Sequence, residues 1–254
     1  MNKIALCFSG QPRFIEEAYS SIKTNIIKDE NIDIFAHLWF DDNLTDKPYK
    51  YGGNGNWQYQ RISKNAIETF KQRYNPVYLI VENSKKFKNS FLEETYQPSL
   101  LRYKKGAINN LLEPNFIERD INNIFSYYYS LNKVCLLKKQ YEYLNNFKYD
   151  LVIRMRTDAI IHTNLNYNSI EDNTLYYSDN QKQPDNMIND WLNYGKSNVM
   201  DSFMGCYPLL EYLIEDCKKQ TNGAWCCELI HKKMMEKMGI NTVGKNICIE
   251  LPRF

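Results

Sequence analysis

The 254-residue sequence lacks a long hydrophobic run and an excess of either charge. No stretch approaches the ~18 apolar residues that a membrane-spanning helix needs. The apolar run after Met1 spans about five residues, whereas the core of a secretory signal needs ~7–15. With 32 basic and 30 acidic residues, the net charge of +2 is too balanced for a general nucleic-acid binder. We therefore expect a cytoplasmic protein (in the host-cell cytosol if the source is a virus) that binds no nucleic acid and makes at most a peripheral contact with a membrane.

The cysteines do not form the pattern of a disulfide framework or of a zinc site. Their number is odd, seven, and no secretion signal accompanies them, which favours reduced thiols. Cys217, Cys226, Cys227 and His231 lack the Cys-x₂-Cys spacing that zinc usually needs, so we interpret these cysteines as core thiols. Arginine is scarce beside lysine, so a cluster of arginines is more informative than a cluster of lysines.

Short apolar segments alternate with amphipathic ones along the chain. We expect strands over 4–8, 32–38, 77–81, 150–154, 174–178 and 199–206, with a weak strand near 247–251. We expect helices over 12–25, 63–74, 117–146, 208–219 and 225–238, and loops over 41–57 and 179–198. The helix over 117–146 is indicated by an apolar stripe whose members recur at spacings of three and four: Ile117, Ile121, Ile124, Tyr128, Leu131 and Cys135. This alternation predicts an α/β fold with a mostly parallel sheet. In such sheets the ligand lies beyond the carboxyl ends of the strands.

Polar segments follow the first two predicted strands. Ser9-Gly10-Gln11-Pro12-Arg13 offers backbone amides and an arginine that suit a phosphate, although it matches neither a P-loop nor a dinucleotide fingerprint. An ordinary strand-to-helix turn is the alternative. After the second strand, Asp41 either contacts a nucleoside or belongs to a polar loop. We interpret His37, within that strand, as a core histidine.

The segment Arg154-Met-Arg156-Thr-Asp158 follows a third apolar strand. Residues two apart on a strand share a face, so the two arginines and the aspartate are expected to point the same way. Charges placed after a buried strand need partners, which here are either each other or a charged ligand. Asp158 could hold a divalent cation, and the arginines could bind phosphates. The alternative is a structural ion-pair cluster.

These segments together resemble a group of bacterial and large-virus glycosyltransferases with a GT-A fold, which are often found with polysaccharide genes. The resemblance covers about residues 3–250. It rests on the motifs Cys7-Phe-Ser-Gly-Gln-Pro-Arg13, Ile34-Phe-Ala-His-Leu-Trp39, Tyr129-Ser-Leu-Asn-Lys133, Tyr149-Asp-Leu-Val-Ile-Arg-Met-Arg-Thr-Asp158, Asp201-Ser-Phe-Met-Gly205 and Glu228 in the last predicted helix.

The resemblance implies one GT-A-like domain over residues 1–254, with a Rossmann-type, mostly parallel sheet flanked by helices. Residues 1–160 would bind the nucleotide sugar and 161–254 the acceptor. Enzymes of this fold usually carry Asp-x-Asp, which holds Mn²⁺ or Mg²⁺ on the diphosphate. Here Arg156 occupies the first position, so Asp158 is the remaining candidate ligand. We expect a divalent metal at Asp158, and the alternative is that Arg156 supplies the positive charge directly.

The chemistry of sugar transfer assigns roles to the candidate residues. The departing nucleoside diphosphate develops negative charge that cations must stabilise. Inverting transfer also needs a carboxylate base, for which we expect Glu228, with Asp201 on the donor sugar. Glu228 could equally be a surface carboxylate and Asp201 the cap of a turn. The residues expected to bind the donor are Ser9, Gly10, Gln11, Arg13, Asp41, Lys133, Arg154 and Arg156.

We therefore expect an enzyme that transfers a hexosyl or deoxyhexosyl group, with inversion, from a nucleotide-diphosphate sugar to a glycan or other acceptor hydroxyl, such as a lipid-linked one. One alternative is a non-catalytic nucleotide- or glycan-binding module of the same fold. Another is a sugar nucleotidyltransferase, although the sequence lacks the Gly-rich, Lys/Arg-containing triphosphate loop that such an enzyme needs.

Overall fold

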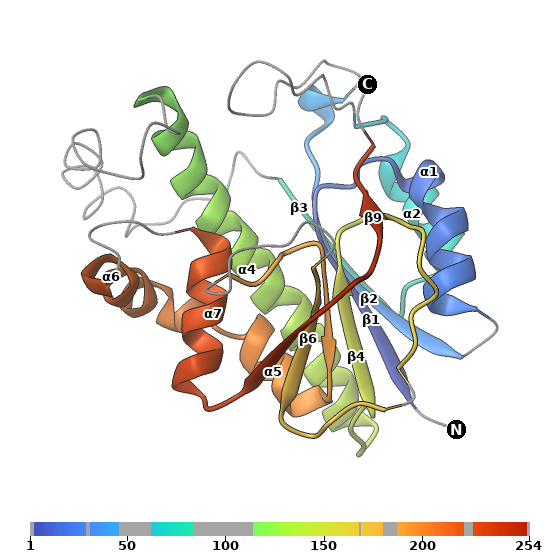
Figure 1. The fold of residues 1–254 in the computed structure, drawn as a ribbon. Helices are drawn as coiled ribbons and strands as arrows, with labels where there is room; N and C mark the ends of the chain where they lie inside the picture. The colour runs from blue at the N-terminus through green and yellow to red at the C-terminus, as the bar shows by residue number, and fades with distance from the viewer. Residues whose placement is uncertain are drawn as a thin grey trace.

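The computed structural model describes residues 3–28, 31–45, 62–83, 114–167, 169–179, 187–220 and 226–252. It contains a seven-stranded sheet of order β3-β2-β1-β4-β7-β6-β8, flanked by helices (Figure 1). Within this sheet β7 runs antiparallel to its neighbours β4 and β6, and the other pairs are parallel. The predicted α/β class with a mostly parallel sheet is therefore confirmed. The strands are β1 Ile4–Gly10, β2 Ile32–Trp39, β3 Tyr78–Glu82, β4 Leu151–Met155, β6 Thr174–Ser178, β7 Leu192–Gly195 and β8 Asn241–Lys245.

Helices cover both faces of the sheet, which explains why the central strands are apolar throughout. In β1, Leu6 and Phe8 pack with α1 and α2, while Cys7 faces the opposite core beneath α4. The helices are α1 Ile15–Ile22, which continues as a π-helical turn over Lys23–Ile27, α2 Ala66–Tyr74, α4 Pro114–Leu144, α5 Ser197–Met204, α6 Leu210–Gln220 and α7 Cys227–Lys237. Short elements complete the described chain: 3₁₀ turns at Asp42–Leu44 and Tyr207–Leu209, and the strand pair β5 Ile160–Ile161 and β9 Ile249–Glu250.

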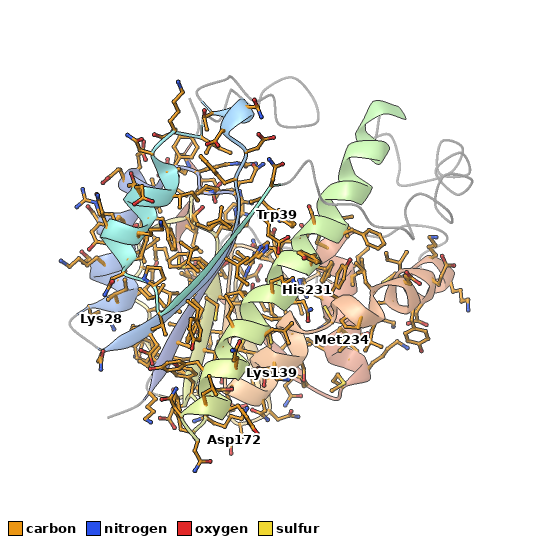
Figure 2. All side chains as sticks on the ribbon, turned by 180° about the vertical axis from the view of Figure 1, so that it is seen from behind. Lys28, Trp39, Lys139, Asp172, His231 and Met234 are labelled. Carbon is orange, nitrogen blue, oxygen red and sulfur yellow. The ribbon has the colours of Figure 1, made fainter. Side chains whose placement is uncertain are left out.

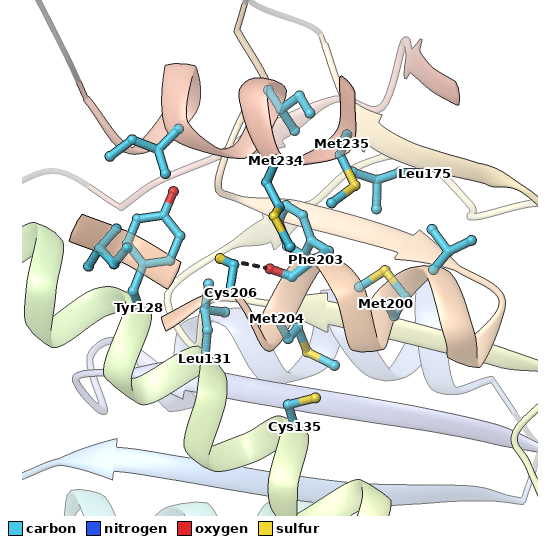
Figure 3. Packing of buried hydrophobic residues seen from close by; sticks show 14 of the residues in the cluster. Tyr128, Leu131, Cys135, Leu175, Met200, Phe203, Met204, Cys206, Met234 and Met235 are labelled. Carbon is cyan, nitrogen blue, oxygen red and sulfur yellow. Dashed lines mark hydrogen bonds between the residues drawn. The ribbon is translucent and has the colours of Figure 1, made fainter. Parts of the chain in front are cut away.

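The long helix α4 buries the predicted apolar stripe. Tyr128, Leu131 and Cys135 of α4 lie against the α5 residues Phe203 and Met204 in a tightly packed core (Figure 3). The predicted stripe also includes side chains near the start of α4, which lie outside the described residues. No helix in the described part of the chain combines the length and hydropathy of a bilayer-spanning segment.

Two predictions about the second half of the chain are wrong. Residues 199–206 are largely helical, because their buried residues, Val199, Met200, Phe203 and Met204, recur at helical spacing. Conversely, β7 lies within a predicted loop, and β8 was not predicted. The segment Leu192-Asn-Tyr-Gly195 has too little apolar character to indicate a strand, and its pairing with β4 and β6 stabilises it instead.

Candidate functional site

Hydrogen bonds join the turn after β1 to the turn after β4. Gly10 has a φ of 120°, which glycine adopts without the strain that a side chain would add. The buried Thr157 hydroxyl donates a hydrogen bond to the Gln11 carbonyl at 2.7 Å and accepts one from the Arg13 amide at 3.3 Å. Thr157 carries no signal in the sequence, because its role depends on two chain segments that meet only in the fold. The two turns therefore present their side chains as one unit.

Arg154 lies buried at the end of β4. Its Nε and Nη2 donate to the Ser9 hydroxyl at 3.1 and 3.0 Å, and Nη1 donates to the Asp190 carbonyl. Its guanidinium carbon lies 5.0 Å from the centre of the Tyr127 ring. These described partners are a hydroxyl, a carbonyl and an aromatic ring, so none of them carries a negative charge. A buried cation held in this way favours a negatively charged ligand nearby.

Arg156 and Asp158 form a two-pronged ion pair just beyond the same strand. Nε of Arg156 lies 2.8 Å from Oδ1 of Asp158, and Nη2 lies 2.7 Å from Oδ2. The Asp158 side chain is 3% exposed, whereas that of Arg156 is 22% exposed. Burial raises the pKa of Asp158, but the charge and hydrogen bonds of Arg156, together with the charge of Arg13, outweigh it and hold the pKa below 3.8. The carboxylate is therefore ionised and enclosed, and the guanidinium is the more accessible partner.

The structure thus brings together six of the predicted donor-site residues and the predicted metal ligand Asp158 at the carboxyl ends of β1 and β4. Arg13 is buried beside them, and its guanidinium donates to the Gln11 side chain. We call this group the arginine cluster. Its members are Ser9, Gly10, Gln11, Arg13, Arg154, Arg156 and Asp158.

The donor set around Asp158 does not fit a resident divalent cation. The described residues contain no group of three His, Cys, Asp or Glu side chains arranged to hold a metal. Mg²⁺ binds through one or two carboxylates together with substrate phosphates. Asp158 is the only such carboxylate in the arginine cluster, and each of its oxygens accepts a hydrogen bond from Arg156. A carboxylate already neutralised by a guanidinium offers a second cation little attraction.

Lys133 lies in a different cluster, at the ends of β2 and β3. Its ammonium group is 5.0 Å from the centre of the Tyr129 ring. The neighbouring His37 is fully buried, with Nδ1 2.8 Å from the Ser130 hydroxyl and Nε2 3.5 Å from Glu82 Oε1. Burial lowers the pKa of His37 to about 4, although Glu82 opposes the shift, so the ring is neutral at pH 7. These contacts agree with the interpretation of His37 as a core histidine.

Asp41 has a local structural contact. Its Oδ1 accepts hydrogen bonds from the backbone and side-chain nitrogens of Asn43, at 2.9 and 3.0 Å. It thereby caps the 3₁₀ turn that begins at Asp42. The carboxylate is buried in this arrangement. This geometry favours the loop interpretation of Asp41 over a contact with a nucleoside.

Asp201 lies at the opposite edge of the sheet from the arginine cluster, which corrects the expectation that it contacts the donor sugar. Its Oδ1 is 2.8 Å from Nζ of the fully buried Lys138. Lys138 is also 2.9 Å from Glu142, which accepts a hydrogen bond from the Tyr149 amide just before β4. Lys148 pairs with the same Glu142 oxygen at 2.9 Å. We call Lys138, Glu142, Lys148, Ser197 and Asp201 the lysine network.

Glu228 lies in the first turn of α7. Its carbonyl accepts a hydrogen bond at 3.2 Å from the amide of Ile188, two residues before Asp190. Burial raises the pKa of Tyr127 well above 10; Arg154 opposes this rise, while Asp190 and Glu228 add to it. The charges of Arg154, Asp190 and Glu228 therefore all act on the same buried ring.

Tyr127 and His231 connect α7 to the arginine cluster. The Tyr127 hydroxyl is 3.0 Å from Nε2 of His231, which stacks on Phe203 with ring centres 4.0 Å apart. Figure 2 shows His231 beside α4, the helix that carries Tyr127. Burial, with a contribution from Arg154, lowers the pKa of His231 well below 6.5. A neutral histidine therefore links the helix of Glu228 to the aromatic ring against Arg154, and sequence reasoning missed this link.

Comparisons with known proteins give no match to a protein-family model or to a curated protein. Solved structures that match include apo mouse xyloside xylosyltransferase 1, with a TM-score of 0.41 and 8% identity over 96% of this chain and 85% of that chain. The apo glycosyltransferase GlyE of Streptococcus pneumoniae TIGR4 matches with a TM-score of 0.40 and 11% identity, over 96% of this chain and 45% of that chain. The galactosyltransferase LgtC, solved with donor and acceptor sugar analogs, matches with a TM-score of 0.39 and 10% identity, over 94% and 72% of the two chains. The likeness is distant, so the functional proposal below rests on side chains and motifs.

Proposed function

We propose that the protein is a glycosyltransferase that moves a sugar from a nucleotide-diphosphate donor to a hydroxyl of a glycan or lipid-linked acceptor. The observation that supports this most is the arginine cluster at the carboxyl ends of β1 and β4. Ligands of open α/β sheets bind beyond these ends, and guanidinium groups bind phosphates with two parallel hydrogen bonds. Two of the motifs that resemble glycosyltransferases, Cys7–Arg13 and Tyr149–Asp158, end in the turns that meet at this edge.

The donor diphosphate would lie against the turn after β1 and against Arg154, Arg156 and Arg13. As the bond to the sugar breaks, negative charge develops on the departing diphosphate. Positive groups that are already in place stabilise that charge without having to reorganise. Arg154 suits this role because Ser9, Asp190 and Tyr127 hold it rigidly in a buried position.

Glu228 is the proposed base of an inverting transfer, which removes the proton from the acceptor hydroxyl. Its support is its place on α7, a helix from the other half of the chain, whose His231 contacts the Tyr127 ring that lies against Arg154. The donor would then bind mainly to residues 1–160 and the acceptor to residues 161–254. We no longer assign a donor contact to Asp201, because its carboxylate lies in the lysine network.

The proposed compartment is the cytoplasm. All the cysteines are free thiols, and Cys7, Cys135, Cys206 and Cys217 are buried as such. Reduced thiols are the rule where glutathione and thioredoxin act.

The first test is ligand stabilisation followed by transfer. The melting temperature is measured with UDP, GDP, dTDP, CMP and ATP, each with and without Mn²⁺. A ligand at 100 times its dissociation constant adds ~2.7 kcal/mol, a shift of about 5–10 °C for a domain of this size. We expect a nucleoside diphosphate to stabilise the protein and the matching nucleotide sugar to be consumed with an acceptor. Binding without turnover would favour the binding module, consumption of a nucleoside triphosphate would favour the nucleotidyltransferase, and no stabilisation by any diphosphate would overturn the proposal.

A further inference from the structure

We propose that this site binds the diphosphate of its donor without a divalent cation, with the Arg156 guanidinium as the counter-charge and Asp158 as the residue that positions it. This inference rests on the proposed function, since it concerns the same donor. It departs from the metal at Asp158 that the sequence motifs led us to expect.

The relative exposure of the two partners supports Arg156 as the group that meets the ligand. The carboxylate of Asp158 is enclosed at 3% exposure, while the guanidinium in front of it is 22% exposed. Asp158 takes the Nε–Nη2 edge of the guanidinium. The other edge, formed by Nη1 and Nη2, has the fork geometry that a phosphate accepts.

The pairing with Asp158 gives Arg156 a fixed orientation. A free arginine loses side-chain rotamer entropy when it binds a ligand. The two hydrogen bonds to a buried carboxylate hold the guanidinium plane before the ligand arrives. The backbone supports the same placement, because the Arg156 amide donates to the Trp191 carbonyl at 3.2 Å. Asp158 thus acts through Arg156, as a positioning residue.

Charge supports the same conclusion. Replacing a carboxylate by a guanidinium at position 156 changes the charge of the site by +2, which equals the charge of the divalent ion that an Asp-x-Asp pair would hold. Arg154 adds a buried cation whose described partners are uncharged. The site therefore has built-in positive charge where a diphosphate would otherwise need a metal.

Titration calorimetry tests this proposal on the whole chain with UDP, GDP, ADP, CDP and dTDP as probes. Each is titrated in excess EDTA and again in excess Mn²⁺. We expect at least one diphosphate to bind with dissociation constants that agree within about twofold in the two conditions. Binding that needs Mn²⁺ would overturn the inference and leave the proposed function standing. Binding of no diphosphate in either condition would overturn both.

Variants at position 156 sharpen the test. Arg156→Ala is expected to weaken diphosphate binding about 10–100-fold, the range for a lost hydrogen-bonded charge. Arg156→Lys should recover part of the loss, because it restores the charge without the fork. Arg156→Asp should make the remaining binding dependent on Mn²⁺, since it creates the missing second carboxylate. The proposal would be contradicted if Arg156→Ala bound the diphosphate as tightly as the wild type. It would also be contradicted if the diphosphate affinity of Arg156→Asp were the same with and without Mn²⁺.

Asp158→Asn and a matched arginine control show whether Asp158 affects diphosphate binding by positioning Arg156 or only by stabilising the fold. Asp158→Asn should weaken binding by less than Arg156→Ala, and Asp158→Glu should restore most of it. Arg73→Ala is the control, because Arg73 also pairs with a carboxylate, Glu16 at 2.8 Å, but lies on α2 just ahead of β3, at the other edge of the sheet. We expect this control to bind diphosphate like the wild type. If Asp158→Asn removes binding only in Mn²⁺, Asp158 is a metal ligand and the inference fails.

Discussion

The two edges of the sheet both hold buried charged side chains, but they arrange them differently. At the amino edge, the lysine network pairs Lys138 with Glu142 and Asp201, and Lys148 with Glu142. At the carboxyl edge, uncharged groups hold Arg154. Arg156 there pairs with Asp158 and is the more exposed of the two side chains. In the first arrangement, each charged side chain is paired with an opposite charge of the protein itself. The second presents positive charge at the place where α/β sheets bind ligands.

This comparison shows why a charged motif does not by itself identify a functional site. Asp158 follows β4 and Asp201 lies within α5, yet both pair with a cation in the structure. The neighbours of Asp201 bind α4, α5 and the start of β4 together, which is a structural task. The neighbours of Asp158 direct a guanidinium towards the ligand edge.

The largest expected effect separates Glu228 from Asp201 in catalysis. Glu228→Gln should lower kcat about 10²–10⁴-fold, the usual contribution of a general base, with diphosphate affinity unchanged. Asp201→Asn should lower the melting temperature but leave kcat per folded molecule near that of the wild type. Steady-state kinetics and thermal unfolding of the two variants check this. A kcat loss in Asp201→Asn at unchanged stability would reverse the two assignments.

The next largest effect is on stability at the amino edge. Lys138→Met removes the buried cation that pairs with Glu142 and Asp201. It should cost ~3–5 kcal/mol, because these two carboxylates then keep only the exposed Lys148 as a cationic partner. The melting temperature should fall by about 10 °C. Denaturant unfolding measures the change, with the exposed neighbour in Lys139→Met as the control. Equal stability of the two variants would show that the lysine network is not structural.

A smaller effect on stability is expected when the buried cation of the carboxyl edge is removed. Arg154→Gln loses a charge that no described carboxylate compensates, so the free energy of unfolding should fall by only ~1–2 kcal/mol, the cost of the lost hydrogen bonds. Diphosphate affinity should fall about 10–100-fold, because the charge serves the ligand. Calorimetry and denaturant unfolding together test this. A stability loss as large as that of Lys138→Met would mean that both edges are structural.

The smallest effect is a pH dependence that both edges share. Burial raises the pKa of Glu142, but hydrogen bonds from Ser197, the Tyr149 amide, Lys148 and Lys138 outweigh it and hold the pKa below 4.5. A lowered pKa means that the unfolded chain binds the proton first, so this stabilisation is present above pH ~4.5 and is lost as the pH falls through the lower folded-state value. Melting temperatures from pH 7 to pH 3 should show this loss, and it should be shallower in Glu142→Gln. An identical slope in the variant would contradict it.

Local patterns in the sequence predicted the elements whose faces are buried and apolar. The stripe from Tyr128 to Cys135 indicated α4, and the unbroken apolar runs indicated β1 and β4. Strand-end reasoning then gathered Arg13, Arg154, Arg156 and Asp158 at one edge. Patterns failed for residues 199–206, where helical spacing was interpreted as a strand, and for β7 and β8, which pairing rather than apolar character stabilises.

The amino-acid sequence alone determined the α/β class, the central strands and the arginines at their ends, because periodicity reports which face of a local segment is buried. Only the tertiary structure decided which partner each charge has. It placed Asp201 with Lys138, paired Asp158 with Arg156, and set Tyr127 between Arg154 and His231. The physical reason is that the electrostatic state of a side chain depends on distances between segments far apart in the chain, and those distances exist only after the helices have packed on the sheet.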